Sequence, residues 1–189
     1  PDKTVYPVAS CNDKDFQNLM HVYLDAVFFP NIYQKEEIFR REGWHYELEN
    51  AEAPLKLNGV VYNEMKGAFS SPEEVLDREV FNSLFPDTPY GVESGGDPNV
   101  IPELSYSEFL EFHKRYYHPV NSYIYLYGNM DMEERLNWMD EHYLSKYDET
   151  VIDSAIPKQK AFDTVKELTM EYPVSENEPE EENSYLSYN

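Results

Sequence analysis

The stretch "GVVYNEMKGAF" (Gly59–Phe69) places one carboxylate inside a segment that otherwise has the pattern of a strand. Val60, Val61 and Tyr62 suit a pleated, half-buried surface. Glu64 then stands where an apolar side chain would be expected. Because carboxylates are rarely buried unless they are paired or bind a metal, this glutamate needs a partner. The stretch therefore predicts a strand and raises the question of what Glu64 contacts.

Two partners for Glu64 are open. Strand alternation puts Tyr62, Glu64 and Lys66 on one face, so that Lys66 is available for a plain salt bridge on the solvent side. The other partner is a metal ion. The spacing by itself favours the salt bridge, but the local pattern leaves the choice open.

Strands are expected in three further places. The segment "KTVYPVASC" (Lys3–Cys11) has strand composition, and Pro7 indicates an edge position or a bulge. The segment "NSYIYLYGN" (residues 121–129) alternates and consists of aromatic and branched side chains. A short strand is also expected at residues 184–188.

Helices are expected where apolar side chains recur at helical spacing between start and stop signals. Asn12 is the predicted cap of the first helix and Asp131 of the last. Ser71 with Glu74, and Ser105 with Glu108, have the spacing of a capping box. The predicted helical stretches are 13–30, 34–49 with a break at Gly43 and an extended end, 70–86, 106–119 and 132–147.

Strands separated by helices predict an α/β fold, or an α+β fold of two layers in which helices cover one face of a sheet. From about Asp148 the sequence becomes irregular and polar. We expect one domain over residues 1–147, a linker over 148–166, and an arm with the start of a second domain over 167–189.

The composition excludes several partners. The formal net charge is −22, from 37 acidic and 15 basic residues. Such a surface repels nucleic acid and anionic lipid, and it suits solubility or cationic ligands. Cys11 is the single cysteine, which excludes an internal disulfide and fits a reducing compartment. No apolar run is long enough to span a bilayer. The chain opens "PDKTVYPVAS" without an initiating Met, so we expect it to be a piece of a longer protein.

No complete catalytic set is present. No two of the five histidines are four residues apart, the spacing that places two imidazoles on one helix face to hold zinc. His113 and His118 are five apart, and His21 fits the edge of a core better than a metal site. The glycines of "ESGGDP" (residues 93–98) have no basic neighbour, so we interpret them as a structural turn.

Several stretches together resemble the presequence protease branch of the insulinase, or pitrilysin-like, zinc peptidase superfamily (M16, subfamily C). They cover nearly the whole chain in the family's order: "PDKTVYPVAS", "FFPNIYQKEEIFRREGWHYELE", "GVVYNEMKGAFSSPEEVL", "YGVESGGDPNVIPELSYSEFLEFHKRYYHPVNSYIYLYGNMD" and "YPVSENEPEEENSYLSYN".

The resemblance implies the insulinase and mitochondrial-processing-peptidase-like fold, truncated at its N-terminal side, with residues 1–147 as the later part of the catalytic domain. Family members hold one zinc ion with two histidines of a His-x-x-Glu-His motif and a downstream glutamate. Glu64 of "YNEMKG" matches that third ligand. The motif itself does not occur in these 189 residues, so we assign no catalytic residue here and expect the fragment alone to be inactive and zinc-free.

The resemblance further implies an ATP-independent zinc metalloendopeptidase that degrades short, unstructured peptides in a closed chamber. Its partners would be peptide substrates and the rest of the polypeptide, namely the upstream zinc-motif helix and the C-terminal half. Exposed sheet edges would also allow a homodimer. We expect a bacterial cytoplasmic protein, with the mitochondrial matrix or another organelle as the alternative. The alternative function is a non-catalytic family member, a peptide-binding or structural subunit. The segment Arg41–Glu49 matches the family without an assignable role.

Overall fold

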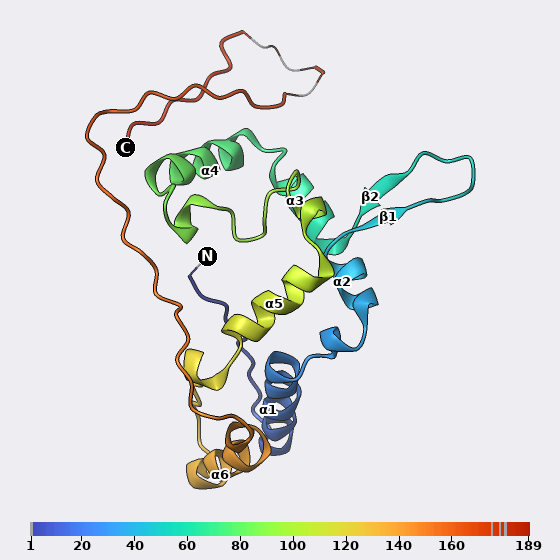
Figure 1. The fold of residues 1–189 in the computed structure, drawn as a ribbon, viewed down its shortest axis with the longest axis vertical. Helices are drawn as coiled ribbons and strands as arrows, with labels where there is room; N and C mark the ends of the chain where they lie inside the picture. The colour runs from blue at the N-terminus through green and yellow to red at the C-terminus, as the bar shows by residue number, and fades with distance from the viewer. Residues whose placement is uncertain (1, 175, 178, 180) are drawn as a thin grey trace. The chain divides into compact units, whose positions relative to one another are not determined.

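The computed structural model describes residues 2–174, 176–177, 179 and 181–189, and its ribbon is drawn in Figure 1. The helices are α1 (Asp13–Phe28), α2 (Glu36–Glu42), α3 (Val60–Ala68), α4 (Pro72–Leu84), α5 (Tyr106–Tyr116) and α6 (Met132–His142). The strands are β1 (His45–Glu47) and β2 (Lys56–Asn58), and the short 3-10 helices are η1 (Asn31–Tyr33), η2 (Pro89–Gly91), η3 (Ile101–Glu103), η4 (Pro119–Asn121) and η5 (Leu144–Lys146). The predicted mixture of helices and sheet is confirmed as a class.

The chain divides into two compact units. The first comprises Pro1–Thr4, Arg40–Leu104 and Ile156–Asn189, and the second comprises Val5–Phe39 and Ser105–Ala155. The first unit holds the hairpin, α3 and α4. The second holds α1, α5 and α6. Each unit is described separately below.

The helix start signals in the sequence are mostly confirmed. Asn12 accepts a hydrogen bond from the Asp15 amide (3.0 Å), and Asp131 accepts one from the Glu134 amide (3.0 Å). Ser105 and Glu108 form the complete capping box at the start of α5. These caps satisfy backbone amides that the first helical turn leaves unpaired, which is why the signals can be found locally.

One capping prediction is wrong. α4 begins at Pro72 as expected, but the Ser71 side chain makes no capping hydrogen bond. The Ser71 hydroxyl instead donates to a carboxylate oxygen of Glu73 at 3.0 Å. The hydrogen bond from the backbone amide of Glu73 itself lowers the pKa of the Glu73 carboxyl most, and the hydrogen bond from the Ser71 hydroxyl lowers it further.

The expected strands are not formed. Among the described residues, the sheet consists of β1 and β2 alone, paired antiparallel with Tyr46 opposite Leu57. Residues 3–11, 121–129 and 184–188 have no strand pairing, and the segment that carries Glu64 is helical. A strand requires a second strand to complete its hydrogen bonds, and a pattern within one segment cannot reveal whether that partner is present.

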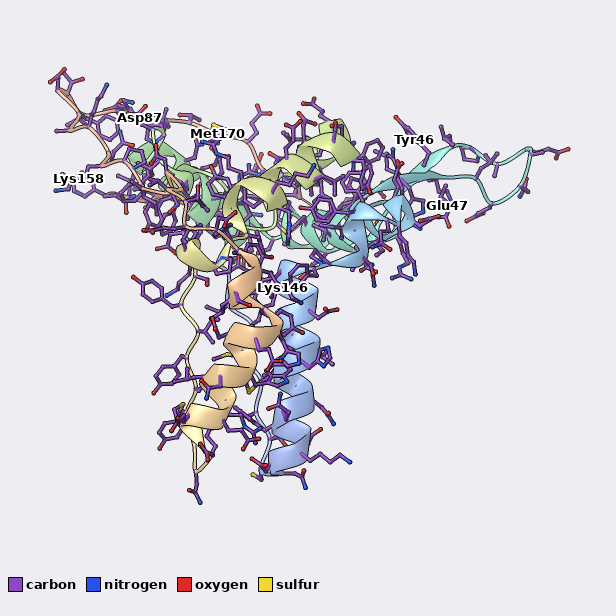
Figure 2. The ribbon with its side chains drawn as sticks, turned by 60° about the horizontal axis from the view of Figure 1, so that its bottom comes forward. Tyr46, Glu47, Asp87, Lys146, Lys158 and Met170 are labelled. Carbon is purple, nitrogen blue, oxygen red and sulfur yellow. The ribbon has the colours of Figure 1, made fainter. Side chains whose placement is uncertain are left out.

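In the second unit, α1 and α6 lie side by side, as Figure 2 shows. Arg135 on α6 is 5% exposed and donates to the Asp13 carboxylate and the Gln17 side-chain oxygen, both at 2.6 Å. The Tyr143 hydroxyl donates to the carbonyl of His21 at 3.1 Å. A buried guanidinium needs such acceptors, so these bonds set how the two helices face each other. Within the described part of the chain, no helix is long and apolar enough to cross a membrane.

Candidate metal-ligand site around Glu64

Glu64 lies on a helix, not on a strand. It occupies the middle of α3 (Val60–Ala68), and its side chain is exposed. Glutamate, methionine, lysine and alanine in the second half of this segment favour helix, which outweighs the strand preference of the two valines at its start. A helix also satisfies its own backbone, so it needs no neighbouring strand.

The salt bridge to Lys66 is not formed. On a helix, residues two apart point in widely different directions, unlike residues on one strand face. Within the described parts of the chain, no side chain donates a hydrogen bond to the Glu64 carboxylate or pairs with it. The carboxylate is therefore free for a ligand that these residues do not supply.

The start of α3 is tied to the hairpin through one side chain, that of Asn58. Its oxygen accepts hydrogen bonds from the Gly59 amide (2.8 Å) and from the Asn63 side chain (2.6 Å). Its amide nitrogen donates to the Glu47 carboxylate at 2.9 Å. Figure 2 labels Glu47 on the hairpin. Asn58, at the end of β2, thus links β1 to the first turn of α3. One of its partners is Asn63, the residue that precedes Glu64.

Backbone contacts fix the same turn. The Tyr62 amide donates to the Gly43 carbonyl at 3.3 Å. Gly59 has φ of +151°, and a Cβ on it would lie 2.2 Å from the Gly43 carbonyl oxygen. Glycine is therefore required at position 59, both for its backbone conformation and for the close approach to residue 43.

The far side of α3 packs against the glycine turn. Met65 is 8% exposed, and a Cβ on Gly95 would lie 2.1 Å from its sulfur. Gly96 has φ of +90°, and its amide donates to the Glu93 carbonyl at 3.1 Å. The interpretation of "ESGGDP" as a structural turn is confirmed. Met65, the residue that follows Glu64, packs against this turn.

These contacts give the segment Arg41–Glu49 a structural role that the sequence did not reveal. Gly43 and Glu47 hold the start of α3, and the Trp44 indole donates to the Leu104 carbonyl at 2.9 Å. The one signal available in the sequence was Asn58 next to Gly59, a pair typical of a tight junction. That pair indicates a turn but does not name Glu47 as its partner.

Only one feature around Glu64 suits a metal ion, the free carboxylate itself. Glu64 offers a free carboxylate on a helix held from two sides, which suits a ligand position. Within the residues that the structure describes, no group of three or more His, Cys, Asp and Glu side chains is placed to hold a metal ion. The described residues therefore do not assemble a three-ligand metal site around Glu64, and the assignment of Glu64 to zinc stays a prediction.

His113, one of the histidines considered for a metal site, has a structural environment in the second unit. His113 on α5 accepts from or donates to the Tyr33 hydroxyl through Nδ1 (2.7 Å), and its Nε2 donates to the Val27 carbonyl (2.9 Å). Its ring stacks on Tyr117. Burial lowers the pKa of His113, and the hydrogen bond to Val27 opposes that shift. The imidazole ties α5 to the end of α1.

A hollow of about 230 Å³ lies between α4 and residues 90–94 of the first unit. Glu74, Asp77 and Glu93 line it together with Arg78, which pairs with Glu79 at 2.6 Å. Phe81 contributes an aromatic wall that is 53% exposed. Glu64 is not among the residues that line this hollow.

Residues 103–189 match the family described as the peptidase M16 inactive domain. The whole chain is 57% identical to the protein HypA of Clostridium perfringens, of which it covers 19%. Over 92% of its length it is 47% identical to presequence protease 1, chloroplastic/mitochondrial, of Arabidopsis thaliana, and over 88% it is 44% identical to the mitochondrial presequence protease of Mus musculus. It covers 16% of each of these two proteins.

The chain thus spans less than a fifth of the length of these relatives. The relatives named presequence proteases are peptidases by name, and they match this chain on both sides of α3. The resemblance inferred from the sequence is confirmed at this level: residues 103–189 belong to the peptidase M16 family, and the chain as a whole is similar to proteins named presequence proteases.

Proposed function

We propose that this chain is one part of a longer zinc metallopeptidase and that it contributes Glu64 as the third zinc ligand. The observation that carries the proposal is the free, exposed carboxylate on α3, held in place by Asn58 and Gly59. The relatives named presequence proteases support the peptidase class. The two other ligands would come from a His-x-x-Glu-His motif outside residues 1–189.

When bound, zinc with three protein ligands supplies a Lewis acid that polarises a peptide carbonyl and activates water near neutral pH. The contribution of this chain is to hold one ligand oxygen. Asn58 fixes the first turn of α3, and Met65 packs against Gly95 on the other side. The orientation of the carboxylate then follows from the helix.

The substrates we propose are short, unstructured peptides with basic residues, degraded without ATP in an enclosed chamber. The net charge of −22 and the acidic lining of the hollow beside α4 support cationic ligands. We place the longer protein in a bacterial cytoplasm, on the strength of the Clostridium relative. An organelle is the alternative suggested by the relatives named as mitochondrial.

The test compares two Glu→Gln variants of the longer polypeptide. Glu64→Gln is expected to lower zinc content to well below one ion per chain and to abolish peptidase activity, because an amide is a poor zinc ligand. Glu52→Gln, at the exposed tip of the hairpin, makes the same chemical change without a role at the metal. It is expected to keep full zinc and full rate. Full zinc and full rate in the Glu64 variant would exclude the proposal.

A second candidate is a non-catalytic, peptide-binding or structural subunit. The description of residues 103–189 as an inactive domain favours it for that part of the chain. A longer polypeptide that holds no zinc but binds a basic peptide in calorimetry, in a manner weakened by salt, would support this candidate over the peptidase. Zinc bound at one equivalent would exclude it.

A further inference from the structure

Residues 122–127 form an extended segment that belongs to neither a helix nor a sheet. The segment follows η4 (Pro119–Asn121), enters extended backbone at Ser122 (φ −134°, ψ 156°) and leads to the cap of α6. In Figure 1 it is a plain tube between these two elements. Its sequence, "SYIYLY", consists of residue types that favour strands and carries no charge.

The side chains of this segment alternate between two environments. Tyr123, Tyr125 and Tyr127 are 105%, 83% and 83% exposed. Ile124 is 40% exposed and Leu126 is half-buried. This alternation between more exposed and less exposed side chains has the period of two of a strand. Three strongly exposed tyrosines at alternate positions place their rings on one face of the segment, and exposed aromatic groups of this kind mark interfaces.

The backbone of the segment is open as well. In the described parts of the chain, no backbone hydrogen bond is made by residues 123–127. An extended segment with a free row of N–H and C=O groups is a template for a further strand. Charged residues or prolines, which block such pairing in natural edge strands, are absent from "SYIYLY".

The relatives indicate where the missing strand comes from. The Clostridium relative matches the whole of this chain with 19% of its own length, so about four-fifths of that protein lies outside the match. A second copy of this chain is a poor partner, because each copy carries a net charge of −22 and the two would repel. We therefore take the remainder of one longer polypeptide, and not a second copy, as the source of the partner strand.

We propose that residues 122–127 are an open β-strand, paired backbone to backbone with an apolar strand from the remainder of the longer polypeptide. The rings of Tyr123, Tyr125 and Tyr127 then pack against cross-strand side chains. The inference rests on the proposed function in one respect, the existence of the longer polypeptide. It concerns a docking site for the rest of the protein, away from Glu64 in sequence and independent of zinc.

Hydrogen exchange of the amides of residues 123–127 tests this pairing. In the longer polypeptide we expect slowing of about 100-fold or more relative to the 189-residue chain, in which these amides exchange as in an unstructured peptide. Rapid exchange in both proteins would overturn the proposal. Protection in the 189-residue chain that grows with protein concentration would assign the edge to a second copy and would also overturn it.

A matched pair of variants of the longer polypeptide checks the backbone contribution. Tyr125→Pro removes an amide donor and is expected to abolish protection at the neighbouring residues, whereas Tyr125→Thr keeps the amide and the strand preference and is expected to retain protection. If the proline variant does not fold, the comparison of the two wild-type proteins still decides the question.

The zinc site is tested separately in the same protein. In Glu64→Gln, zinc content reports on the proposed function and protection of residues 123–127 reports on the docking strand. Retained protection with zinc lost is the expected result. Full zinc in this variant excludes only the ligand assignment, and loss of protection in the wild-type protein excludes only the docking strand.

Discussion

Residues 59–69 and 121–129 have similar strand-like patterns, but they adopt different structures. The first forms α3, and Asn58, Gly43 and Met65 hold it in place within the first unit. Most of the second stays extended after η4, with three exposed tyrosines, and residues 123–127 make no backbone hydrogen bond in the described part of the chain. A helix completes its hydrogen bonds within one segment, whereas a strand needs another. The comparison shows that the pattern of a segment does not determine its structure by itself, because the partners available to the segment also decide it.

The largest effect is expected at the close approach before α3. Gly59→Ala should destabilise the protein by about 3 kcal/mol, because it adds both a strained positive φ and a clash with the Gly43 carbonyl. Urea unfolding measures this change. Gly67→Ala is the matched control on the same helix. Nothing lies within 4 Å of its added Cβ, so it should be neutral or stabilise by up to about 1 kcal/mol. Equal effects at the two glycines would contradict the description of the junction.

The next effect tests the side-chain link. Asn58→Ala removes three hydrogen bonds and leaves the Gly59 amide without its acceptor, so we expect a loss of about 2 kcal/mol in the free energy of unfolding. Asn58→Asp keeps the acceptor oxygen but places a second carboxylate beside Glu47. The loss of unfolding free energy in this variant should become smaller as the pH falls and one of the two carboxyl groups is protonated. If the loss of unfolding free energy caused by Asn58→Asp were the same at pH 7 and pH 4, this would contradict the contact between residue 58 and Glu47.

A smaller, pH-dependent effect is expected from the second unit. The pKa of His113 is lowered below 6.5 by burial, so the unfolded chain binds the proton more readily than the folded one. The stabilisation is complete above the unfolded pKa and is lost as pH falls through that value towards the folded pKa. The stability of the wild-type protein should therefore decrease more steeply from pH 7.5 to pH 5.5 than that of His113→Gln. Parallel curves for the two proteins would refute this.

The smallest effect is expected where the chain has no partner. In the 189-residue chain, Tyr125→Pro should change stability by no more than about 0.5 kcal/mol, because the lost amide makes no backbone hydrogen bond in the described residues. Thermal unfolding beside Tyr125→Thr measures this change. A cost of several kcal/mol would mean that residues 122–127 are already paired within this chain.

Local signals predicted the helices well. Asn12, Ser105 and Asp131 cap the helices expected of them, and Gly43 ends α2 before β1. These features depend on residues within one turn of each other, so they can be read from one segment. Ser71 shows the limit, because its hydroxyl has a competing acceptor at Glu73 that the capping pattern does not weigh.

The candidate site was predicted less completely. The resemblance to the family indicated Glu64, and the choice between a salt bridge and a ligand stayed open in the sequence. The helical position removed the pairing with Lys66 that strand alternation had suggested. The ligand assignment and the division into residues 1–147, 148–166 and 167–189 stay predictions.

The sequence by itself determined the acidic charge, most of the capped helices and the similarity to the M16 family, and it supplied the prediction that Glu64 matches the family's third zinc ligand. These depend on composition, on contacts within a single turn, or on similarity along the chain. Only the tertiary structure decided that Glu64 lies on a helix, that Asn58 and Glu47 hold that helix, and that residues 123–127 make no backbone hydrogen bond within the described residues. The helix at Glu64 depends on a balance of local preferences that the alternating pattern did not resolve, and the other two features depend on contacts, made or missing, between separate segments.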